Sequence, residues 1–106
     1  AETEYLKAIE IKPDYFEPLI SLGIIYYNQA AEQVNAAQSI NDNKKFNEAV
    51  NVSLETFKKS LKFVELADAA KPNELNVLET LKSLYYRLEM NDKYNEVMER
   101  INKINE

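Results

Sequence analysis

A single glycine in 106 residues is the feature that most restricts what this chain can fold into. Only three prolines accompany it, so few residues are suited to β-turns or flexible linkers. The composition is otherwise that of a soluble globular protein, with 45% hydrophobic and 29% charged residues. The sequence therefore predicts one all-α domain whose helices are joined by short polar segments.

The first half of the hydrophobic pattern predicts two helices. Residues 1–11 form the first helix, which Pro13 ends. The second helix begins after Asp14, an N-cap candidate, and Glu17 completes a capping-box-like pair with it. Pro18 lies in the first turn, where a missing N–H costs little.

Three further helices are expected in the second half. A turn around residues 40–43 should start a long helix near Asn43 that runs to about Ala70. Asn73 is the expected N-cap of the next helix, which we predict to extend through residues 88–90. A turn at residues 91–92 then leads to the last helix, so the total is five.

The only glycine lies within an apolar helical face. Leu19, Leu22, Gly23 and Tyr26 follow the spacing L-x-x-L-G-x-x-Y, and a glycine there permits close packing against a partner helix. The later part of the same helix is rich in alanine, which also permits close approach. These alanines are Ala30, Ala31, Ala36 and Ala37.

This spacing resembles the first helix of a tetratricopeptide repeat, whose period is about 34 residues. The spacing of Ala1, Tyr5, Ala8 and Pro13 is similar to the end of such a repeat. The resemblance implies antiparallel helix pairs stacked in a right-handed superhelix. It divides the chain into the second helix of a truncated repeat (1–12), an elongated repeat (14–71) and a C-terminal repeat (73–106), all within a longer array.

The middle repeat exceeds the family length. Pro13 and Pro72 are about 59 residues apart, so about 25 residues are in excess of one period. We expect them in a protruding helical hairpin whose inserted tip spans about residues 29–53, lengthened by roughly 18 Å. The tip is either a self-contained coiled coil or an arm that contacts another subunit or domain.

The long third helix carries a mostly apolar stripe, whose members recur at close to 3.5-residue spacing, and this pattern suits an antiparallel helical hairpin. Its members are Phe46, Val50, Ser53, Phe57, Leu61 and Val64.

In the family that the chain resembles, the first helix of each repeat lines a concave groove. Tyr27 and Tyr86 would be its aromatic anchors, or merely partly packed residues, whereas Tyr26 and Tyr85 would point into the core. The residues that the resemblance places on the groove are Glu17, Ile20, Ile24, Tyr27, Asn28, Asn76, Glu79, Ser83, Tyr86 and Arg87.

The groove differs from the carboxylate clamp of some family members. Ile20, Ile24 and Thr80 replace polar residues of that clamp, so a bound C-terminal carboxylate is not expected. Apolar Ile and Tyr residues with a lone Arg87 suit an extended or helical segment with apolar anchors.

Composition argues against several classes of function. Without histidine or cysteine the chain lacks imidazole bases, thiol nucleophiles and thiolate metal sites, and no cofactor motif is present. The net charge of −5 disfavours nucleic acid, and no apolar run would insert into a membrane. The sequence predicts a non-enzymatic protein-binding scaffold or, alternatively, a structural segment of a larger assembly. It would be soluble in the cytoplasm or the bacterial periplasm, and its uncovered terminal helices could self-associate.

Overall fold

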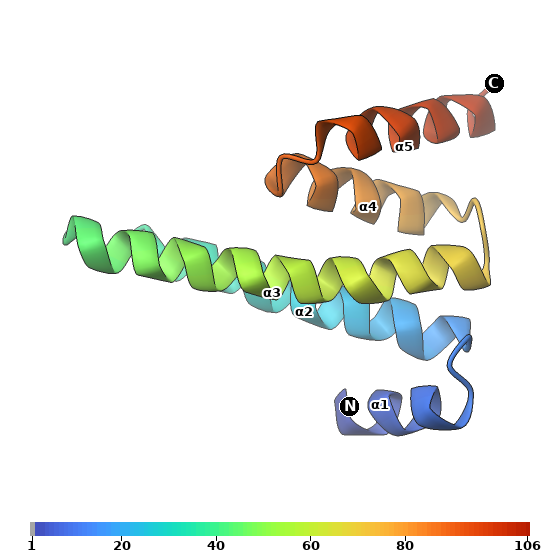
Figure 1. Ribbon diagram of the computed structural model, residues 1–106, viewed down its shortest axis with the longest axis horizontal. Coiled ribbons are helices and arrows are strands. Elements are labelled where there is room, and N and C mark those ends of the chain that lie inside the picture. The colour runs from blue at the N-terminus through green and yellow to red at the C-terminus, as the bar shows by residue number, and fades with distance from the viewer. Residues whose placement is uncertain (1) are drawn as a thin grey trace.

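A computed structural model describes residues 2–106, and this part of the chain forms five α-helices and no strand. The helices are α1 (Glu2–Ile11), α2 (Phe16–Ala37), α3 (Asn43–Ala70), α4 (Leu75–Arg87) and α5 (Asn91–Ile104). Consecutive helices run antiparallel and lie side by side in chain order, from α1 at one edge to α5 at the other (Figure 1). The all-α prediction with five helices is therefore confirmed.

The molecule is a flat, open row of helices. Its extents are 44 × 36 × 17 Å and its radius of gyration is 15.1 Å, against about 13 Å expected for a compact domain of this length. The joined ends of α2 and α3 extend well beyond the other helices (Figure 1). We call residues 29–53 the arm and the rest of the molecule the body.

The starts of the two long helices differ in how they are capped. The Asp42 carboxylate accepts a hydrogen bond from the Lys45 amide at 3.1 Å, which is the side-chain cap that starts α3. At α2 the N-cap is Tyr15, without a side-chain hydrogen bond, so the expected capping by Asp14 is wrong. Pro18 does lie in the first turn of α2, as predicted.

The boundaries of α4 also differ from the prediction. Its N-cap is Glu74 rather than Asn73, and Asn73 instead takes a positive φ of 65° in the loop. The helix ends at Arg87, so residues 88–90 do not extend it and Asn91 already begins α5. Glu89 has a φ of 57°, and the amides of Glu89 and Met90 donate to the carbonyls of Tyr86 and Tyr85, forming a Schellman motif.

Helices α2 and α3 approach closely at the single glycine. A Cβ built on Gly23 would collide with Cγ2 of Val64. The Ser60 hydroxyl donates to the Gly23 carbonyl at 2.6 Å, and both groups are buried. Leu19 and Leu22 are fully buried on the same face, so the expected role of this stretch in close packing is confirmed.

The core of the body continues from this contact through α3 into α4 and α5. It is made of leucine, valine, isoleucine and aromatic side chains, joined by Ala30 from the base of the arm: Phe57, Leu61, Val64, Val77, Leu78, Leu81, Leu84, Tyr85, Val97 and Ile101. Tyr85 is buried as expected, while Tyr26 is only partly buried and stacks on Phe63 at 5.7 Å between ring centroids.

The arm packs differently, with small side chains between its two helices. Ala30, Ala37 and Ser53 are buried, whereas Ala31 is half-buried and Ala36 is exposed. The apolar stripe of α3 is buried from Ser53 onward but not at its beginning. Phe46 is 36% exposed and Val50 is half-buried.

Candidate functional site

A groove of about 280 Å³ lies between α2 and α4. It is lined by Ile24, Tyr27, Glu79, Thr80 and Ser83. Four of these residues belong to the ten that the family resemblance places on a groove, and Thr80 is the residue that replaces part of a carboxylate clamp. The fold therefore brings residues more than fifty positions apart into one concave feature.

The two apolar residues of the groove are held in different ways. Ile24 is 45% exposed, because α2 turns this side away from α3. Tyr27 is half-buried, and its ring meets the Phe57 ring edge-on at 5.5 Å between centroids. Tyr27 is thus partly packed on the core and only partly available to a ligand.

Tyr86 is the free aromatic residue of this face, with 73% of its surface exposed. It lines a second hollow of about 250 Å³ with Lys82, Ser83 and Tyr94, and its ring is 6.1 Å from that of Tyr94. Ser83 lines both hollows, so they adjoin along the exposed side of α4.

Arg87 lies where α4 faces the base of the arm. Its guanidinium is 4.9 Å from the centroid of the Phe57 ring and 5.8 Å from that of Tyr27, which holds it by cation–π attraction. Arg87 and the two residues after it, Leu88 and Glu89, also border a hollow of about 620 Å³ that lies between the end of α4 and α3. The other lining residues are Asn51, Leu54, Glu55 and Lys58.

The contribution of α3 to this face was missed from the sequence. Leu54 is a leucine that lies off the predicted apolar stripe, which is the sequence signal that could have indicated a second contact, and it is half-buried. The remaining predicted residues do not line the groove between α2 and α4. Glu17, Asn28 and Asn76 are exposed on their helices, and Ile20 packs partly against the core.

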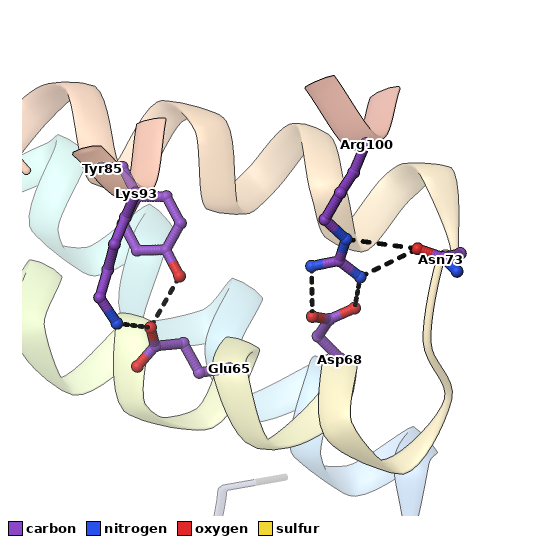
Figure 2. A network of polar contacts seen from close by, with 6 residues as sticks. All are labelled: Glu65, Asp68, Asn73, Tyr85, Lys93 and Arg100. Atoms are coloured by element: carbon purple, nitrogen blue, oxygen red, sulfur yellow. Dashed lines mark hydrogen bonds and ion pairs between the residues drawn. The ribbon is translucent and has the colours of Figure 1, made fainter. Parts of the chain in front are cut away.

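A polar network fastens α3 to the last two helices (Figure 2). The Arg100 guanidinium donates two hydrogen bonds of 2.8 Å to the Asp68 carboxylate and further bonds to the Asn73 side chain. Glu65 accepts from the Tyr85 hydroxyl at 2.7 Å and lies 3.5 Å from the Lys93 ammonium.

Two tyrosines that donate to carboxylates resist ionisation. Burial, together with the hydrogen bond to Glu65, raises the pKa of Tyr85. The hydrogen bond to Glu2 is the largest cause that raises the pKa of Tyr26 to about 12. Similarly, the bond to Asp68 raises the pKa of Arg100. Each of these hydrogen bonds joins two different helices, so the raised pKa values arise from contacts that hold the helices together.

Two features are absent from residues 2–106, a cluster of metal-binding side chains and a membrane-spanning helix. No group of three or more acidic side chains is placed to hold a metal ion in this part of the chain. Within the same residues, the helices are too short or too polar to cross a membrane.

Comparison with protein-family models, with curated proteins and with solved structures found no match to this chain. The tetratricopeptide resemblance therefore stays a prediction.

Proposed function

We propose that this chain is a non-enzymatic protein-interaction scaffold that binds a peptide or protein segment in the groove between α2 and α4. The observation that supports it most directly is the groove itself, with exposed Ile24 on one wall, Glu79 and Ser83 on the other, and exposed Tyr86 beside it. An apolar surface with a few polar groups at its rim is the usual composition of a site that takes an apolar anchor.

We also propose that α2–α3 and α4–α5 are two units of a tetratricopeptide-like array. The support is the similar spacing of Leu19, Leu22 and Tyr26 to Leu78, Leu81 and Tyr85, and the side-by-side order of the helices. In such an array α2 and α4 are the helices that face the ligand, which agrees with the groove described above.

A structural segment without a binding site is the second candidate, and one observation favours it. The outer side of α1 leaves Leu6 and Ile11 exposed, and Ile11 is 87% exposed. In a longer array, a preceding helix would cover this side. This candidate predicts that groove substitutions change no interaction.

The test is affinity capture from a lysate of the source organism, followed by titration of the purified protein that is captured. Ile24→Asp/Tyr86→Ala is the variant of choice, because both side chains are exposed and Tyr27 supports the core. Ile11→Asp is the matched control for an exposed apolar residue outside the groove. We expect binding to fall at least about tenfold with the groove variant and not with the control. Equal binding by all three proteins would reject the groove.

A further inference from the structure

The tip of the arm has a composition that matches the groove. We propose that the arm tip of one copy docks in the α2–α4 groove of a second copy, which gives a two-fold symmetric dimer. This inference rests on the proposed function, since it names the occupant of the same groove.

The tip presents an aromatic ring beside two lysines, with the exposed Glu48 half a turn further along α3. Phe46 lies in the first turn of α3, where the short connection between the helices leaves its ring partly uncovered. Lys44 and Lys45 are exposed, and neither forms an ion pair with a carboxylate of residues 2–106. The nearby Asp42 carboxylate is occupied by its cap at the start of α3.

The groove presents the complementary features. Ile24 and Tyr27 form its apolar part, and its volume of about 280 Å³ is roughly that of nine water molecules at ~30 Å³ each, which is ample for one aromatic side chain. Glu79 lies on its wall, and exposed Glu17 is two turns before Ile24 on α2. The Glu79–Lys82 pair is exposed at 3.6 Å, so a lysine from a second chain could replace Lys82 at little cost.

Helix α2 forms part of both the tip and the groove, so the contact between two copies can be reciprocal. From Ile24 to the end of α2 is about 20 Å. Two copies whose α2 helices lie antiparallel would therefore place each tip at the other copy's groove. The two-fold axis would pass near half-buried Ala31, whose small side chain permits close approach. Both tips are then used, so the assembly closes at a dimer.

The test is sedimentation velocity of the full chain between about 1 and about 500 μM. We expect a concentration-dependent dimer whose association constant falls at least about tenfold with Phe46→Asp at the tip and with Ile24→Asp in the groove. Ile11→Asp on α1 should leave it unchanged. Circular dichroism establishes that each variant is folded.

A mixing experiment separates docking from unfolding. Phe46→Asp keeps an intact groove and Ile24→Asp keeps an intact tip, so their mixture should recover association through one of the two junctions. Likewise, Lys45→Glu and Glu79→Lys should each weaken the dimer, and combining them in one chain should restore it.

Several results would overturn the inference. A wild-type protein that remains monomeric throughout the concentration range rejects it. So does a dimer weakened by Ile11→Asp, which would pair through α1, or one weakened by Val52→Asp and not by Phe46→Asp, which would pair along α3. A captured partner that is lost with Ile24→Asp and kept with Phe46→Asp would support the proposed function while the self-docking fails.

Discussion

The α2–α3 hairpin is built from two kinds of helix contact along a single pair of helices. In the body, Leu19 and Leu22 of α2 and Phe57 and Val64 of α3 are buried, and Gly23 lets the two helices approach closely. In the arm, alanine and serine replace these large side chains, and α1 and α4 no longer cover the flanks (Figure 1). Because burial of apolar area is the main stabilising term, the body should hold the fold while the arm adds little.

The arm also contains a polar defect that the body lacks. The Gln33 carbonyl oxygen Oε1 is buried and has no hydrogen-bond partner among residues 2–106. In the body, the buried Ser60 hydroxyl is satisfied by the Gly23 carbonyl. A buried acceptor without a partner costs about 1–3 kcal/mol. The unpaired acceptor is a second reason to expect that the arm contributes less to the stability of the fold than the body.

The largest expected difference is between two phenylalanines of α3. Phe57→Ala removes a fully buried ring and should lower the free energy of unfolding by about 3–5 kcal/mol. Phe46→Ala in the arm should cost less than about 1 kcal/mol, because its ring is partly exposed. Urea unfolding of the dilute protein measures both. Equal losses would show that arm and body are equally packed.

The contact at the glycine gives the next largest effect. Gly23→Ala should destabilise the protein by about 1–2 kcal/mol, because the collision with Val64 outweighs the gain in helix propensity. Val64→Ala in the same chain should relieve the collision, so the double-mutant cycle should show a favourable coupling of about 1 kcal/mol or more. Asn28→Ala, at an exposed site of α2, is the control and should not destabilise. Additive effects would mean that the helices are not in close contact here.

A stabilising substitution is expected in the arm. Gln33→Met keeps a side chain of similar length and removes the unpaired oxygen. The free energy of unfolding should therefore rise by about 1 kcal/mol. The exposed Gln29 on the same helix provides the control, and Gln29→Met should change stability by less than about 0.5 kcal/mol. A loss of stability with Gln33→Met would show that this carbonyl is satisfied in solution.

Alkaline pH should lower the stability of the body, because Tyr26 and Tyr85 donate hydrogen bonds to carboxylates there. Each has a pKa raised above the ordinary value of about 10, so its contribution is present below about pH 10 and is lost as pH rises further. The Tyr26→Phe/Tyr85→Phe variant should therefore lose stability less steeply between about pH 10 and about pH 12 than the wild type. Parallel curves from denaturant titrations would contradict the assignment.

Local sequence patterns predicted the helices and their close contact, since both depend on spacing along one segment. Gly23, Ala30 and Ala37 were expected to permit close packing, and all three are buried. The end of α4 was missed because Glu89 occupies a left-handed position that glycine normally fills, and backbone hydrogen bonds alone close the turn.

The candidate site was predictable in part for a related reason. The family resemblance placed Ile24, Tyr27, Glu79 and Ser83 on one surface, and all four line the groove, although Tyr27 also packs partly on the core. The approach of Leu54 and Arg87 depends on how far α3 and α4 slide past each other, which no local pattern encodes. The tetratricopeptide resemblance and the binding role stay predictions.

Amide hydrogen exchange along α3, measured by NMR at about 20 μM and about 500 μM, tests the central claim most directly. The account predicts slow exchange at both concentrations for residues 57–67 of the body. It predicts fast exchange for residues 46–52 of the arm in the dilute sample and clear slowing in the concentrated one, where tips occupy grooves. Uniform exchange along the whole of α3, independent of concentration, would contradict both the weakness of the arm and its docking.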